Sequence, residues 1–202
     1  MRLLKMFPTS INEKYVDTIV TALKDGCIII LPTDTLNAIA CDALNNRAIE
    51  RICKIKDLDP NRSTLSIVCS DISQASDYAK IDNKAFKVLK DYLPGPYTFI
   101  LPASTSLPKV FKGRKTVGVR IPDNPIAEAL AAALGNPLMT TSIDVDADAP
   151  FESVMPDSIA MRYGDNVDII IDAGEGEIVP STVVDITDSS QPEVLREGKG
   201  EW

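Results

Sequence analysis

The sequence Lys112-Gly-Arg-Lys-Thr-Val-Gly-Val-Arg-Ile-Pro122 joins a basic run to an apolar strand, and the rest of the fold is organised around it. Its apolar residues alternate as one face of a strand does: Val117, Val119 and Ile121. The opposite face then carries Thr116, Gly118 and Arg120. Arg120 therefore points away from the apolar side, just before Pro122 ends the strand. This pattern predicts either an anion-binding arginine or an arginine that is ion-paired beside a core strand.

The residues before this strand form the most positive window of the chain. No acidic residue lies between Ile100 and Asp123, although the protein as a whole has a net charge of -8. Ammonium and guanidinium groups bind phosphates, so the window is a candidate RNA contact; the alternative is a solvated loop. Its basic residues are Lys109, Lys112, Arg114 and Lys115.

The composition predicts one soluble domain over residues 1–202. Hydrophobic residues make up 45% of the chain and charged residues 25%, which is ordinary for a globular protein. No apolar run approaches the roughly 18 residues that a membrane span needs, and no signal peptide is visible, so we expect a cytoplasmic protein without a membrane partner. The acidic pI near 4.6 argues against nucleic-acid binding over the whole surface, but it is compatible with a local basic cavity.

Histidine is absent from the sequence, and this absence limits the chemistry. A Ser-His-Asp triad, a His-Glu-x-x-His zinc site and histidine general-base catalysis are all excluded. The cysteines are widely spaced, without a Cys-x-x-Cys motif, which favours buried thiols over a zinc site or a disulfide framework. We therefore expect no intrinsic metal or organic cofactor. The cysteines are Cys27, Cys41, Cys53 and Cys69.

Buried β-branched segments alternate with segments of helical period, which predicts an α/β (α+β) domain with both parallel and antiparallel strands. Residues 27–31 form an apolar run typical of a strand buried on both faces, and it leads into Pro32-Thr-Asp-Thr35. Ser10 and Glu13 fit a capping box for the first helix, Asn46 can cap the second helix, and Lys56 lies in the last turn of that second helix. Further strands are expected at 3–7, 65–69, 97–101, 138–143, 167–171 and 181–186. Further helices are expected after Asp71, Asp82 and Asn124 and over 158–163. Residues 144–157 are expected to form an acidic surface loop.

Hydroxyl side chains gather at the ends of the expected strands, where α/β sheets place ligand contacts. The chain has neither a Gly-x-x-x-x-Gly-Lys-Ser/Thr loop nor a Gly-x-Gly-x-x-Gly loop, so a nucleotide site must be of another design. Because Ser and Thr also favour turns, this pattern by itself indicates only a pocket for an anionic small molecule or phosphate. The hydroxyls belong to Thr33, Thr35, Thr98, Thr116, Thr140, Thr141, Ser142, Ser181 and Thr182, and the candidate cations are Lys56, Arg120 and Arg196.

The chain carries several motifs in order: Pro32-Thr-Asp-Thr35, Pro94-Gly-Pro96 with Thr98, Lys115-Thr-Val-Gly-Val-Arg-Ile-Pro122, Pro137-Leu138 with Thr141-Ser142, and Ser181-Thr-Val-Val-Asp185 with Leu195-Arg196. Together they resemble the YrdC/YciO-like domain family, whose better-studied members are threonylcarbamoyl-adenylate synthases acting in tRNA modification. The resemblance implies a YrdC-like fold, with twisted mixed parallel and antiparallel sheets and helices around a large, positively lined cavity. It also implies a reaction that joins bicarbonate, L-threonine and ATP into threonylcarbamoyl-AMP and releases pyrophosphate.

The resemblance also implies roles for individual residues. L-threonine would be held by Thr35, Arg120 and Ser181, with Arg120 on its carboxylate. Lys56 and Arg120 would be the candidate catalytic residues, and Mg²⁺ would accompany the ATP. Double-stranded RNA or tRNA would contact Lys109, Lys112, Arg114 and Lys115. The nucleotide would lie along Lys56, Ser63, Thr116, Thr140, Ser142 and Arg196.

Among the departures of the chain from the catalytic branch of this family, two change the charge of a motif. The Lys-x-Arg triplet of that branch is Lys56-Asp57-Leu58 here, so a cation is lost. Its Ser-x-Asn triplet is Ser142-Ile143-Asp144, which adds a negative charge near the phosphates unless Mg²⁺ bridges it. Leu58 resembles the YciO-like branch instead. Three functions therefore stay open: a threonylcarbamoyl-adenylate synthase linked to tRNA t6A modification, a non-catalytic module that binds nucleotide, double-stranded RNA or tRNA, and a binder of some other small molecule.

Overall fold

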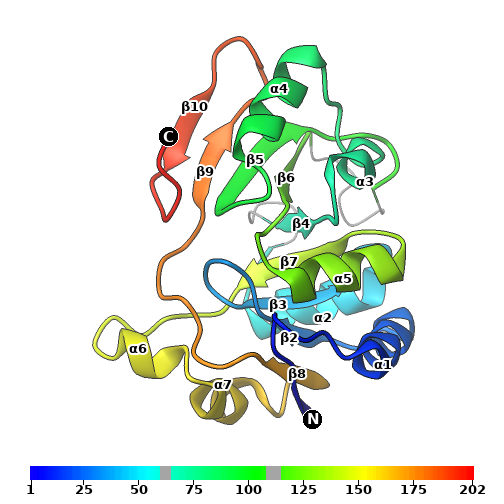
Figure 1. The fold of residues 1–202 in the computed structure, drawn as a ribbon, viewed down its shortest axis with the longest axis vertical. Helices are drawn as coiled ribbons and strands as arrows, with labels where there is room; N and C mark the ends of the chain where they lie inside the picture. Colours follow the sequence, from blue (N-terminus) through cyan, green and yellow to red (C-terminus); the bar gives the residue numbers. More distant parts are fainter. Residues whose placement is uncertain (60–64, 108–114) are drawn as a thin grey trace.

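The computed structural model describes residues 1–59, 65–107 and 115–202. Its described residues form one mixed sheet flanked by helices (Figure 1). The strands are β1 (Arg2–Lys5), β2 (Ile29–Leu31), β3 (Ala38–Asp42), β4 (Ser66–Val68), β5 (Tyr97–Pro102), β6 (Thr116–Arg120), β7 (Leu138–Ser142), β8 (Ile169–Asp172), β9 (Thr182–Asp185) and β10 (Glu193–Arg196). The helices are α1 (Glu13–Lys24), α2 (Asn46–Ile55), α3 (Ile72–Ser76), α4 (Asn83–Tyr92), α5 (Pro125–Leu134), α6 (Pro150–Ser153) and α7 (Pro156–Tyr163).

The order of the strands in the sheet is β1-β8-β2-β3-β7-β4-β6-β5-β9-β10. The pairs β1/β8, β2/β8, β4/β6 and β5/β9 are parallel, and the other neighbours are antiparallel. The mixed α/β fold predicted from the sequence is therefore confirmed. Strand β6, which carries Arg120, lies inside the sheet, where Gly118 is paired with Ser66 on one side and Ile100 on the other.

The buried residues form two clusters, because successive side chains of a strand point to opposite faces. In the second strand Ile30 belongs to the cluster that includes α2, α4 and α7, whereas Ile29 and Leu31 belong to the cluster that includes α1 and α5. The alternation predicted for residues 112–122 is confirmed, since Val117, Val119 and Ile121 all lie in the first cluster. In the described part of the chain, no helix is both long and apolar enough to cross a membrane.

Helix starts follow the predicted capping residues in most cases, but α2 is capped by Asn45 and not by the predicted Asn46. Asp71, Asp82 and Asn124 each accept hydrogen bonds from backbone N–H groups in the first turn of the helix that follows. The first helix is different, because its cap is Asn12, whose Oδ1 accepts from the backbone N of Lys14 at 3.1 Å. The predicted capping box at Ser10 is therefore wrong: a short bridge between Phe7 and Ser10 ends two residues before the helix begins.

The last residues of the chain pack back onto the sheet. Trp202 stacks on Tyr92, with ring centroids 4.6 Å apart and an angle of 24° between the rings. The hydroxyl of Tyr97 donates to the carbonyl of Glu201 at 2.6 Å, and that of Thr182 donates to the carbonyl of Gly200 at 2.6 Å. These contacts hold the C-terminal segment (residues 197–202) against β5 and β9, beside the residues that form the site described next.

Candidate functional site

The described residues enclose a cavity of about 290 Å³ between the ends of the central strands and the C-terminal end of α2. It brings together residues that are far apart in the sequence, and five of them were predicted as site residues: Lys56, Arg120, Ser142, Ser181 and Arg196. The other residues of its wall are Leu65, Ser66, Thr98, Ile100, Gly118, Thr141, Ile143, Asp144 and Val183. Six of its polar side chains fall into three groups, each with its own hydrogen bonds.

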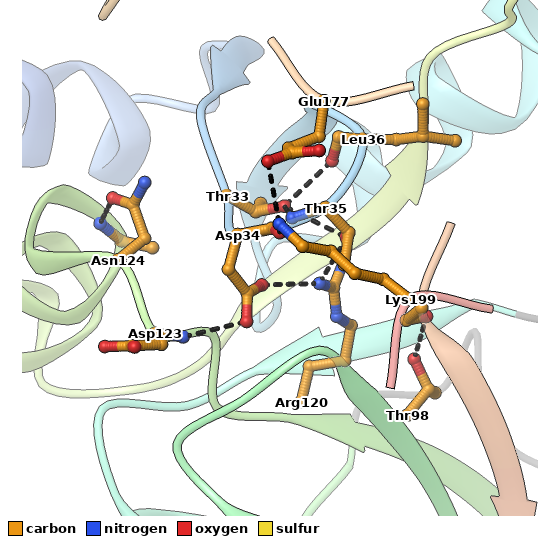
Figure 2. Close-up of polar contacts among 12 residues, drawn as sticks. Thr33, Asp34, Thr35, Leu36, Thr98, Arg120, Asp123, Asn124, Glu177 and Lys199 are labelled. Carbon is orange, nitrogen blue, oxygen red and sulfur yellow. Dashed lines mark hydrogen bonds and ion pairs between the residues drawn. The ribbon is translucent and has the colours of Figure 1, made fainter. Parts of the chain in front are cut away.

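The first group is centred on Arg120, which is only 4% exposed at the end of β6. Its Nη2 donates to Thr35 Oγ1 at 2.7 Å and to Asp34 Oδ1 at 3.2 Å, both in the turn that follows β2 (Figure 2). The hydroxyl of Thr33 in turn donates to the carbonyl of Leu36 at 2.8 Å, which fixes this turn. Arg120 is therefore both ion-paired and part of the cavity wall.

Asp34 is itself held in place from two other elements. Its Oδ2 accepts from the backbone N of Asp123 at 3.1 Å, and its carbonyl accepts from Lys199 Nζ at 2.8 Å. Lys199 also pairs with Glu177 at 2.7 Å, so the C-terminal segment is tied to the turn that supports Arg120 (Figure 2). The sequence analysis missed Lys199, because no local pattern shows which residue a lysine near the C-terminus will contact.

One N–H donor of the Arg120 guanidinium lacks a hydrogen-bond acceptor. Its Nε is buried, and no acceptor contacts it in the described part of the structure. Burial lowers the pKa of the Arg120 guanidinium; the carboxylate of Asp34 opposes this effect, and the charge of Arg196 adds to it. A buried N–H without a partner is costly, so the position of the Arg120 side chain carries an energetic cost in this structure.

The second group consists of Ser181, Thr98 and Arg196. The hydroxyl oxygens of Ser181 and Thr98 lie 2.7 Å apart. Arg196, in β10, donates from Nη2 to the carbonyl of Ser181 at 2.7 Å and contacts its hydroxyl at 3.3 Å. Among the residues that the structure describes, no carboxylate pairs with Arg196, so its charge is available to an anion. Burial lowers the pKa of Arg196, although the residue as a whole is exposed.

The third group is an ion pair at the C-terminal end of α2. Lys56 Nζ contacts Asp144 Oδ1, and the Lys56 side chain is only 9% exposed. Asp144 is also bound from α7, since its backbone N donates to Tyr163 Oη at 2.9 Å and its carbonyl accepts from Arg162 Nη1 at 3.1 Å. Burial alone would raise the pKa of the Asp144 carboxyl, but the hydrogen bond and charge of Lys56, with Tyr163 and Arg162, hold that pKa below its usual value.

Gly118 forms part of the cavity wall, between strands β4 and β5. A Cβ atom at this position would lie 3.2 Å from Ser66 Cβ and 3.2 Å from Thr98 Cγ2. Glycine therefore leaves room that any other residue would fill. The hydroxyl of Ser66 lies 3.1 Å from that of Thr140, which is 1% exposed and is not part of the wall.

Several predicted site residues lie elsewhere or beyond the described part of the chain. Thr116 and Thr140 are not among the residues of the cavity wall, so a nucleotide contact from either stays a prediction. Leu58 does not reach the cavity; it packs against the first hydrophobic cluster after Asp57 adopts a positive φ of 50°. Lys115 is exposed just before β6. Outside the described residues lie Ser63, Lys109, Lys112 and Arg114.

The cavity has few groups that suit a metal ion. Within residues 1–59, 65–107 and 115–202, no three His, Cys, Asp or Glu side chains are placed to hold one. The anionic side chain at the cavity wall, Asp144, is engaged by Lys56. In a nucleotide reaction here, Mg²⁺ would arrive bound to the phosphates, as part of the substrate.

Comparisons with known proteins match nearly the whole chain. The Sua5/YciO/YrdC family model, described as telomere recombination, matches residues 21–198. The uncharacterized protein YciO of Escherichia coli (strain K12) is 38% identical over 196 residues, which cover 96% of this chain and 94% of YciO. A putative threonylcarbamoyl-AMP synthase of Methanocaldococcus jannaschii is 33% identical over 178 residues, covering 88% of this chain and 83% of that protein.

Solved structures agree with these matches. The crystal structure of E. coli YciO has a TM-score of 0.90 and 36% identity, and the match covers 100% of this chain and 98% of YciO. The crystal structure of P. abyssi Sua5 complexed with L-threonine has a TM-score of 0.86 and 29% identity, and the match covers 98% of this chain and 58% of Sua5.

Proposed function

Because this chain belongs to the Sua5/YciO/YrdC family, we propose that it binds L-threonine and an adenine nucleotide and forms threonylcarbamoyl-AMP. Two relatives support this proposal: the M. jannaschii protein is named a putative threonylcarbamoyl-AMP synthase, and the Sua5 structure contains L-threonine. The product would serve tRNA t6A modification, as the family resemblance implies.

The observation that carries the proposal is the state of Arg120. The side chain is held by Asp34 and Thr35, and the residue forms part of the cavity wall. Guanidinium groups bind carboxylates through two parallel hydrogen bonds. The carboxylate of L-threonine would accept from the guanidinium N–H groups of Arg120 that reach the cavity. The hydroxyl of Ser181 would lie on the same wall.

The proposed reaction has two steps. The amine of L-threonine and bicarbonate condense to a carbamate with loss of water. A carbamate oxygen then attacks the α-phosphorus of ATP, a new P–O bond forms, the bond between the α-phosphorus and the bridging oxygen breaks, and pyrophosphate leaves with the electron pair. Positioning and electrostatic stabilisation can drive such a transfer without a histidine base. Arg120 would hold the amino acid, and Arg196 would face the phosphates.

The test is a coupled pyrophosphate assay with Mg²⁺·ATP, bicarbonate and L-threonine, in which each substrate is omitted in turn. We expect pyrophosphate only when all are present. Arg120→Lys keeps a charge but removes the guanidinium fork, so activity should fall by about tenfold or more. Lys87→Ala, an exposed charge change on α4, is the matched control and should leave the rate unchanged. A rate that is independent of L-threonine would overturn the proposal.

One observation favours the alternative, a nucleotide-binding module without catalysis. The ion pair between Lys56 and Asp144 removes a free cation from the cavity wall, and a synthase needs cations beside the leaving pyrophosphate. The same assay separates the two functions when it is combined with calorimetry. Nucleotide binding together with complete absence of pyrophosphate release, in wild type and in Asp144→Asn, would establish the binding module.

A further inference from the structure

The charges around the cavity nearly cancel one another. Among the residues that the structure describes, Lys56, Arg120 and Arg196 are the cations of the wall. Asp144 pairs with Lys56, and Asp34 pairs with Arg120. Arg196 is thus the cation that has no carboxylate partner in this set. Within the described part of the wall, one uncompensated cation matches a ligand with one phosphate group better than a chain of three.

Contacts from several side chains hold Asp144 in place. Contacts from α2 and α7 converge on it: Lys56 from one helix, and Tyr163 and Arg162 from the other. Tyr163 Oη both accepts from the Asp144 backbone N at 2.9 Å and donates to its Oδ2 at 3.2 Å. A carboxylate held from both sides does not swing away when an anion enters, so it keeps neutralising Lys56 and repels a phosphate placed beside it.

We infer that Asp144 is a specificity-determining residue that makes the cavity select nucleoside monophosphates and their acyl anhydrides over nucleoside triphosphates. This inference rests on the proposed function, because it requires that a nucleotide enters this cavity. A single phosphate can meet Arg196, whereas two further phosphates bring negative charge toward the Lys56–Asp144 pair.

The test is calorimetric titration of AMP, ADP and ATP in metal-free buffer with a chelator, so that Mg²⁺ does not mask the phosphate charges. Wild type should bind AMP about tenfold or more tightly than ATP. Asp144→Asn keeps the shape of the side chain, removes its charge and frees Lys56. It should tighten ATP binding by about tenfold and AMP binding much less.

Asp146→Asn is the control, since it makes the same chemical change on the same exposed loop, while the Asp146 carboxylate accepts only from Asp148 N in that loop. It should leave all three affinities unchanged. Wild type that binds ATP as tightly as AMP, or an Asp144→Asn variant with unchanged preference, overturns the inference. If pyrophosphate release is then still observed, the proposed function stands without it; if no nucleotide binds any variant, both fail.

Discussion

The guanidinium of Arg120 and the carboxylate of Asp34 form a buried ion pair of 3.2 Å, in which the two side chains are 5% and 9% exposed. It joins β6 to the turn after β2, and these elements are not neighbours in the sheet. A buried pair contributes little net stability as a whole, because both charges lose their hydration. Removing one member is costly, however, since the other charge is left buried without a partner.

Asp34→Ala should therefore destabilise the protein by about 3–5 kcal/mol, which urea unfolding can measure. Asp123→Ala is the matched control, because Asp123 contacts Asp34 through its backbone N and its side chain is exposed. That control should change the free energy of unfolding by no more than about 0.5 kcal/mol. Equal effects of the two substitutions would show that the ion pair does not hold the turn.

Gly118→Ala should reduce ligand binding more than it reduces stability. The added methyl group would meet Ser66 and Thr98 at 3.2 Å each, on the wall of the cavity. We expect a loss of about 1–3 kcal/mol of stability from overpacking and a clear loss of ligand affinity in calorimetry. Combining it with Thr98→Ser removes the crowded methyl group of Thr98 and keeps its hydroxyl. The double variant should recover part of both losses; no recovery would mean that the crowding lies elsewhere.

The Asp144 carboxyl should titrate below its ordinary pKa of 3.8. Lys56 favours the ionised form, so the ion pair stabilises the folded protein above that pKa, and this stability is lost as the pH falls through the lower folded-state pKa. NMR titration of the carboxyl carbon measures the shift directly. Lys56→Met should raise the pKa of Asp144 relative to wild type, whereas Lys54→Met, on the same helix, should not. A pKa that does not respond to Lys56→Met would contradict the pairing.

RNA binding remains a prediction from the basic window before β6. If those residues contact phosphates, the affinity for duplex RNA or tRNA should fall with salt. Lys115→Ala should then reduce the slope of log affinity against log salt concentration by about one unit. Lys87→Ala, with the same loss of charge on α4, should leave the slope unchanged. Binding that is independent of salt, or absent at low salt, would remove the support for an RNA-binding role.

Much of the fold was predictable because local patterns and packing agree. The alternation in β6 and the capping residues Asp71, Asp82 and Asn124 reflect short-range physics that the sequence carries directly. The analysis did not predict β3, a buried strand whose small residues Ala38 and Ala40 give a weak strand pattern. It also treated α6 as part of an irregular loop, because a helix of one turn, here without a side-chain cap, leaves little trace in a sequence.

Part of the cavity wall was predictable from the sequence, but the ion pairs at the wall were not. Hydroxyls and cations at strand ends indicated the cavity, and Lys56, Arg120, Ser142, Ser181 and Arg196 do line it. Which carboxylate meets which cation depends on tertiary contacts: Asp34 lies 86 residues from Arg120 along the chain, and Asp144 lies 88 residues from Lys56. No periodic pattern carries that information. For this reason the sequence shows Asp144 as an added negative charge but does not show that it pairs with Lys56.

Trp202 is the only tryptophan of the chain, and it stacks on Tyr92 of α4. It belongs to the same C-terminal segment as Lys199. Indole emission of this protein therefore comes from one position, which reports on how residues 197–202 dock. Lys199 ties the same segment to the turn that supports Arg120. A ligand that shifts this turn would change the quenching of a single fluorophore, so the molecule contains an optical probe of residues 197–202 and needs no attached dye.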